Sequence, residues 1–220
     1  MATRFILYLS LLAAVFLFGL LNPRMLSLPF EILCVVVGIT LVSEAASGFL
    51  NLRGYNNMPV YHFLSCIEYA GTALVFHGLL RSARIKKLVI YSIIPVAVIG
   101  IMNSVFLQDM RTFPSNILLL SHGIFLILSL LLFKQMLEEP VARNLFRQGE
   151  FWIAGAYLLF SSAVFLSFGL QNYFKRNQLN LEPLNHMIYF TNILFYTLLG
   201  IALYTEQSHN KETFINEQKQ

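Results

Sequence analysis

The chain has 220 residues, of which 57% are hydrophobic and only 12% are charged, and its mean hydropathy is +0.66. Soluble domains usually carry about 25% charged residues, so this composition excludes an ordinary soluble domain. The net charge of +4 and the pI near 9.1 could suggest nucleic-acid binding. In a chain this apolar, however, basic residues mark the loops that set membrane topology, so we predict no nucleic-acid partner.

Seven apolar segments, each about as long as a bilayer-crossing helix, follow one another along the chain. The predicted spans cover residues 5–21, 30–50, 60–80, 88–108, 114–133, 151–172 and 183–204. They predict an all-α fold, with one seven-helix transmembrane domain over residues 1–205. Residues 206–220 are polar and lack a hydrophobic pattern, so we predict a disordered cytoplasmic tail.

The basic residues predict the orientation of the bundle. Seven spans place the two termini on opposite sides of the membrane. The side of the N-terminus receives five of the 15 Lys and Arg residues, namely Arg4, Arg53, Arg111, Lys175 and Arg176, and the other side receives ten. Cytoplasmic loops are enriched in Lys and Arg, so we expect the N-terminus outside and the C-terminus in the cytoplasm. Bacterial inner membrane is the expected location.

The third span carries a polar face in an otherwise apolar helix. Tyr61, Ser65, Glu68 and Thr72 recur three or four residues apart, so they share one side of the helix. A carboxylate at this depth is costly unless it faces the protein interior and has partners there. Glu68 is therefore the centre of the candidate site.

Other spans place polar groups at similar depths, slightly outward of the bilayer midplane, if each helical residue rises about 1.5 Å. The candidate ligand-binding residues are Glu44, Glu68, Asn103, His122 and Asn192, with His62 and His186 nearer the outer surface. The inner half is mostly Leu, Ile, Val and Phe. This asymmetry predicts a polar cavity that opens, or can open, toward the outside.

Each candidate also has a structural interpretation. Glu44 and Glu68 could be held by hydrogen bonds between helices, and the asparagines could serve only as interhelical contacts. His122 could pair with a carboxylate or bind a backbone carbonyl. His62 and His186 lie near the interface, where a histidine costs little.

A threefold repeat is a further hypothesis for spans two to seven. The ends of three spans look alike: Ser47-Gly-Phe-Leu-Asn51, Ser104-Val-Phe-Leu-Gln108 and Ser167-Phe-Gly-Leu-Gln171. Each is followed by a basic loop residue, a proline and then a polar residue in the next span. Repeats of this kind are typical of transporters, although apolar sequences also match by chance.

Three functions remain open from the sequence. The first is a sensor or carrier that binds a small polar molecule or ion, with Glu68 or Glu44 as the titrating group of a proton-coupled carrier. The second is a metal-dependent hydrolase that uses His62, Glu68, His122 and His186, although no pair has a clean i, i+4 ligand spacing. The third is a structural subunit. HExxH, P-loop, GxSxG and CxxC motifs are absent, and we predict no metal or cofactor.

The stretch Asn56-Asn57-Met-Pro-Val-Tyr-His62, followed by Glu68-Tyr69, resembles a group of small uncharacterised bacterial seven-helix membrane proteins. The resemblance covers mainly the second and third spans. It implies a multi-pass inner-membrane protein and no particular activity. The expected partners are membrane lipid, the small ligand or ion, and a cytoplasmic or membrane protein that docks on the basic loops.

Overall fold

The computed structural model describes residues 2–138 and 144–217, and over these residues the protein is helical, without strands. The long helices are α1 (Ala2–Leu21), α2 (Leu28–Leu52), α3 (Met58–Leu79), α4 (Ala83–Met102), α5 (Ser115–Glu138), α6 (Gly149–Arg176) and α7 (Glu182–Glu217). Short helical turns cover Pro23–Met25, Asn103–Leu107 and Leu145–Arg147. The predicted all-α class and the number of long helices are therefore confirmed.

Prolines begin two of the helices that build the site. Pro29 and Pro59 occupy the first turns of α2 and α3. A proline lacks the N–H that this position would leave unpaired, and its fixed φ suits the start of a helix. At the other end of α2, Gly54 has a φ of +76° and turns the chain toward α3. The starts of α2 and α3 and the turn between them thus follow from the local sequence.

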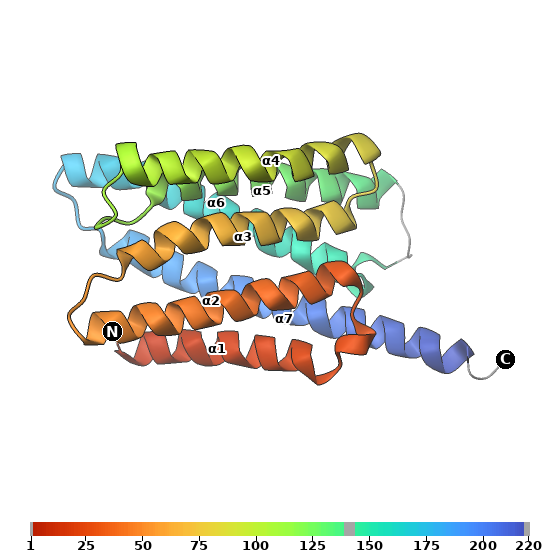
Figure 1. The fold of residues 1–220 in the computed structure, drawn as a ribbon. Helices are drawn as coiled ribbons and strands as arrows, with labels where there is room; N and C mark the ends of the chain where they lie inside the picture. The colour runs from red at the N-terminus through yellow and green to blue at the C-terminus, as the bar shows by residue number, and fades with distance from the viewer. Residues whose placement is uncertain (1, 139–143, 218–220) are drawn as a thin grey trace.

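The helices form a bundle whose two termini lie at opposite ends (Figure 1). Consecutive helices pack on one another from α1 to α4 and again from α5 to α7, and α7 also packs on α1. Helix α4 packs mainly on α3 and touches α5 only slightly. The bundle therefore closes as a ring of α1, α2, α3, α5, α6 and α7, with α4 outside it.

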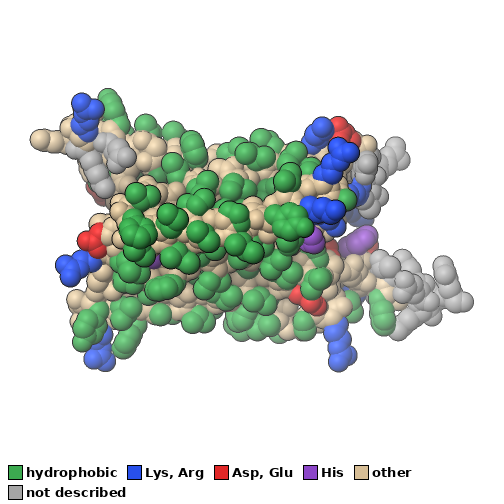
Figure 2. Space-filling model, turned by 45° about the horizontal axis from the view of Figure 1, so that its top comes forward, with side chains coloured by type: hydrophobic (Ala, Val, Ile, Leu, Met, Phe, Trp, Pro, Cys, Tyr) green, Lys and Arg blue, Asp and Glu red, His purple; other side chains and the backbone are tan. Residues whose placement is uncertain are grey.

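The surface agrees with a membrane location. Six helices, all but α3, are long and apolar enough to cross a bilayer. Hydrophobic side chains cover the middle of the face drawn in Figure 2, whereas charged side chains gather at its two ends. Helix α3 has 22 residues and includes His62, Glu68 and His77, which lower its hydropathy. The described chain is accordingly a helical, membrane-like bundle, compatible with a multi-pass membrane protein.

An aromatic cluster joins α3, α5 and α6. The Phe76 ring lies 5.3 Å from the Tyr157 ring and 6.4 Å from the Phe125 ring, measured between centroids. Tyr69 stacks on Phe125 at 5.5 Å, and its hydroxyl is 2.7 Å from the Ser92 hydroxyl on α4. Buried rings packed in this way fix the relative positions of the helices that carry them.

The end of the chain differs from the expectation of a disordered segment over residues 206–220. Helix α7 continues to Glu217, and residues 218–220 lie outside the described part. Neither Gly nor Pro interrupts this stretch. Two of its polar side chains bind backbone carbonyls of α1 and of the short turn that follows α1. Gln207 donates to Phe18 O at 3.4 Å, and Asn210 donates to Met25 O at 2.9 Å. These contacts are polar, so a search for hydrophobic periodicity misses them.

The threefold repeat stays a prediction. In the α2–α3 and α6–α7 hairpins the two helices pack extensively on each other, whereas α4 and α5 barely touch. The three hairpins therefore differ in how closely their helices associate.

Candidate functional site

A cavity of about 290 Å³ lies inside the ring of helices, and we call it the central cavity. It is lined by side chains from α1, α2, α3, α5, α6 and α7, and by Phe113 from the α4–α5 connection. Small-molecule sites usually measure about 300–1,000 Å³, so the central cavity is close to the lower end of that range and fits only a compact ligand. Because Phe113 lies at the N-terminal end of the bundle, the central cavity reaches that end.

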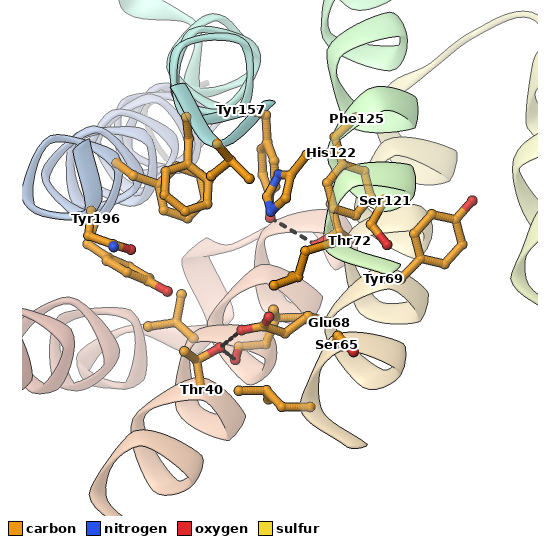
Figure 3. Close-up of a pocket in the computed structure, with 18 of the residues that line it drawn as sticks. Thr40, Ser65, Glu68, Tyr69, Thr72, Ser121, His122, Phe125, Tyr157 and Tyr196 are labelled. Atoms are coloured by element: carbon orange, nitrogen blue, oxygen red, sulfur yellow. Dashed lines mark hydrogen bonds between the residues drawn. The ribbon is translucent and has the colours of Figure 1, made fainter. Parts of the chain in front are cut away.

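Glu68 extends into the central cavity from the middle of α3 (Figure 3). Thr40 of α2 donates a hydrogen bond to Glu68 Oε1 at 2.7 Å. The other carboxylate oxygen, Oε2, accepts no hydrogen bond from the described residues. The side chain is partly exposed despite its central position, because it faces the cavity and not lipid. A carboxylate with one free oxygen can accept a donor from a bound molecule.

Glu44, one helix away on α2, sits in a denser hydrogen-bond network. Tyr61 donates to Glu44 Oε2 at 3.0 Å, and Tyr8 of α1 donates to Oε1 at 3.4 Å. Ser47 donates to the Tyr61 hydroxyl at 2.9 Å, and Asn57 donates to Ser47 at 2.7 Å. Both oxygens of Glu44 are therefore engaged by protein hydroxyls.

The central cavity contains two carboxyl groups, and none of the described residues is a basic partner for them. Among the described residues, neither a lysine nor an arginine lines it. His122, the one imidazole that the described residues place on its wall, binds Ser161 on α6 with a Nδ1–Oγ distance of 3.2 Å. Its ring also meets the edges or faces of Phe125 and Phe160 at centroid distances of 5.6 and 5.1 Å. His122 is thus held by α5 and α6 and is not paired with either acid.

Ser121, next to His122 on α5, has a hydroxyl without a hydrogen-bond partner in the described part of the chain. Its side chain is 2% exposed and lines the central cavity. Serines and threonines inside helices commonly bind the carbonyl one turn earlier, as Ser129 does to Phe125 O at 2.8 Å. A buried polar atom without a partner is unusual, and the described residues include a second one, Ser167 Oγ, which does not line the central cavity.

Four of the seven predicted ligand-binding residues meet at the central cavity, namely Glu44, Glu68, His122 and Asn192. Asn192 donates to Ile188 O at 3.0 Å on its own helix, which leaves its carbonyl oxygen available. The depth estimate placed these four side chains at similar depths in the membrane. The rotations of their helices turn all four toward the central cavity.

The other three predicted residues do not line the central cavity, which corrects the expected lining. His62 Nδ1 lies 2.7 Å from Ser104 Oγ and His62 Nε2 lies 3.0 Å from Thr112 O, so this ring ties α3 to the α4–α5 connection. Asn103 accepts from Asn116 at 3.0 Å and thereby links the short turn after α4 to α5. Both residues turn toward neighbouring segments, and depth alone cannot predict that rotation.

His186 lies near the surface at the N-terminal end of the bundle. Its Nε2 atom is 2.8 Å from Arg4 Nη1 and 3.6 Å from Glu182 Oε1. These contacts join the beginnings of α1 and α7. A role of His186 inside the central cavity is therefore not supported.

Several lining residues were not among the predicted set. They are mainly aromatic or hydroxyl side chains: Tyr8, Thr40, Thr72, Ser121, Tyr157 and Tyr196. Tyr157 and Thr72 bind each other with an oxygen–oxygen distance of 3.0 Å. A tyrosine hydroxyl inside a predicted span needs a polar partner, and this was the available signal for Tyr8 and Tyr196.

The geometry does not form the metal site that a hydrolase would need. Within residues 2–138 and 144–217, no three His, Cys, Asp or Glu side chains lie close enough together to share a metal ion. His62 and His186, two of the four proposed ligands, bind other segments. The hydrolase alternative therefore has no ligand set in the described structure.

Comparison of the chain with protein-family models, curated proteins and solved structures finds no match. The function must accordingly be inferred from the geometry of the central cavity.

Proposed function

We propose that this membrane protein binds a small polar molecule or ion in the central cavity and acts as a sensor or carrier for it. The observation that carries the proposal is the pair Glu44 and Glu68 on the wall of a 290 Å³ cavity that no described lysine or arginine lines. Ionisable groups within a membrane are costly, and they are kept mainly where they serve binding or transport.

A purely structural role explains the site less well. Polar side chains that only join helices would be satisfied by one another, as His62 and Asn103 are. Glu68 retains a free oxygen, and Ser121 retains a free hydroxyl among the described residues. Both residues line the central cavity, and the Glu68 oxygen without a donor among the described residues is the group that a molecule bound there could satisfy.

The direction of access follows from the expected topology. The central cavity reaches the N-terminal end of the bundle, where Phe113 lines it. The excess of basic residues at the opposite end favours an outside location for the N-terminal end. We therefore propose access from outside the cell, in a bacterial inner membrane, in line with the resemblance to small bacterial seven-helix proteins. A sensor would pass its signal to a partner at the basic cytoplasmic end.

Replacement of Ser121 by leucine should block binding without unfolding the protein. Ser121→Leu removes a hydroxyl that forms no hydrogen bond with the described residues and puts a larger side chain on the wall of the central cavity. Wild-type protein should be stabilised by at least one member of a panel of organic cations, organic anions, zwitterions and inorganic ions, because ligands that bind the folded state raise the melting temperature. Ser121→Leu should lose that stabilisation while its ligand-free melting temperature stays within a few degrees of wild type.

The matched control introduces the same residue outside the site. Thr197 is exposed on α7, so Thr197→Leu should respond to the panel as wild type does. An identical response of Ser121→Leu and wild type to every stabilising compound would show that binding occurs elsewhere. A wild-type protein that no member of the panel stabilises would count against the binding function itself.

A further inference from the structure

We propose that the ligand is an organic cation that carries an ammonium group, with Glu68 as its counter-ion and the aromatic side chains of the central cavity as the surface around it. This inference rests on the proposed binding function and specifies the chemical class of the ligand.

The charges on the wall of the central cavity select a cation. Glu44 and Glu68 both face it, and the described lining includes no lysine or arginine. The hydroxyl donors Thr40, Tyr8 and Tyr61 stabilise the carboxylates but do not neutralise them. An anionic ligand would add a further negative charge to a low-dielectric space and would be repelled. A cationic ligand supplies the positive charge that no described lysine or arginine supplies here.

The two acids differ in what they can offer such a cation. Both oxygens of Glu44 accept tyrosine hydroxyls, whereas Glu68 Oε2 has no donor among the described residues. Glu68 also lies farther from the N-terminal end of the bundle than Tyr61 does, on the same face of α3 and next to Thr72. Glu68 is therefore the group that contacts the ammonium, and Glu44 adds to the negative potential at a distance.

Aromatic rings form much of the remaining wall. Phe160 stacks on Phe195 with centroids 4.4 Å apart, and Phe195 in turn meets Tyr157 and Tyr196, each at 5.0 Å. All four side chains line the central cavity, and Figure 3 shows Tyr157 and Tyr196 on the side of it opposite Ser65 and Tyr69. The faces of such rings attract ammonium groups, as in the aromatic cages that bind quaternary amines.

The size and surface of the central cavity argue against a bare metal ion. A hard cation such as Ca²⁺ takes six to eight oxygen ligands at short distances. The described residues offer no converging metal ligands, and the wall between the two acids is largely hydrocarbon and aromatic. A volume of about 290 Å³ instead suits an organic molecule whose apolar part contacts the rings.

Pairs of probe molecules that have similar shapes but different charges test this inference. The probes are choline against 3,3-dimethylbutan-1-ol, its neutral isostere, and 2-phenylethylammonium against 2-phenylethanol, with acetate and sodium as further competitors. Binding to the purified full-length protein is measured by calorimetry in nanodiscs of phosphatidylglycerol, and again with phosphatidylcholine added. The second lipid distinguishes a free solute from a choline headgroup, because a headgroup that entered the site would compete with the probe.

One or both ammonium probes should bind at least about tenfold more tightly than the neutral molecule of similar shape, because the neutral molecule cannot form an ion pair with Glu68. Glu68→Gln should remove this preference, whereas Glu138→Gln, at an exposed surface pair with Lys134, should retain it. Tyr196→Leu should weaken cation binding by about three- to thirtyfold relative to Tyr196→Phe, which keeps the ring. The melting temperature of each variant verifies that it is folded.

Equal binding of the charged and neutral partners, or tighter binding of acetate, would overturn the inference and leave the binding function intact. Cation preference that survives in folded Glu68→Gln would also overturn it, because Glu68 would then not be the counter-ion. Failure of every probe class to bind wild-type protein would contradict the binding function as well, so the two failures can be told apart.

Discussion

Phe76→Ala should destabilise the bundle by about 3–5 kcal/mol, the range for removal of a large aromatic side chain from a packed core. Phe76 is fully buried on α3 and packs against Tyr157 of α6 and Phe125 of α5. In lipid or detergent the loss comes mainly from the empty volume, since the neighbouring rings lose their van der Waals contacts outright. Because Tyr157 and Phe125 also line the central cavity, this variant should bind ligand more weakly even where it folds.

Reversible unfolding in mixed micelles, followed by far-UV circular dichroism, measures the loss of stability. The control is Phe63→Ala, one residue after His62 on the same helix, where the ring is exposed on the outer surface of the bundle. That change should cost far less. If both variants unfold at the same denaturant concentration, Phe76 is not the packing centre that the structure indicates.

Gly149→Ala should lower the free energy of unfolding by about 1–3 kcal/mol through overpacking. A methyl group at Gly149 would lie 2.6 Å from Phe30 Cζ and 2.9 Å from the backbone oxygen of Ala202. The Phe30 ring is buried and the carbonyl belongs to α7, so neither can move without shifting a helix. The close approach of α6 to α2 and α7 therefore requires glycine at this position.

The same helix supplies the control for this change. A methyl group at Gly169 would meet no atom within 4 Å. Gly169→Ala should therefore be neutral or stabilise α6 by roughly 0.5–1 kcal/mol, because alanine loses less backbone entropy than glycine on forming a helix. Comparison of the two melting temperatures tests the packing of α6, and a destabilisation of Gly169→Ala as large as that of Gly149→Ala would contradict it.

Much of the fold could be predicted from the sequence because apolar segments of bilayer length dominate it. The helices are longer than the predicted spans at several ends, most clearly at the end of α7. There the polar residues Gln207 and Asn210 bind backbone carbonyls of α1 and of the turn that follows it. Hydropathy measures transfer into lipid, so it does not detect helix that is stabilised by polar contacts beyond the membrane.

The site could be predicted only in part, for a geometric reason. Depth along a helix follows from residue number, and it placed Glu44, Glu68 and His122 in one layer. The direction in which a side chain points depends on the rotation and the neighbours of its helix. His62 has a depth similar to that of the lining residue Tyr61, yet it turns toward Ser104 and the α4–α5 connection.

The most direct test of a water-accessible cavity at Glu68 is the rate at which a small cationic thiol reagent modifies single cysteines along α3. Cys34 and Cys66 are free thiols and are first replaced by alanine. Ser65→Cys then places a thiol on the cavity wall, where the native side chain is 3% exposed, and Ile67→Cys places one on the outer surface, where it is 48% exposed.

In membrane vesicles, 2-(trimethylammonium)ethyl methanethiosulfonate should modify Ser65→Cys and leave Ile67→Cys largely unmodified, because thiols react as thiolates in water and not in lipid. Addition of Glu68→Gln should slow the reaction at position 65. An unreactive cysteine at position 65, or equal rates at positions 65 and 67, would contradict the central claim that Glu68 faces an aqueous cavity inside the bundle.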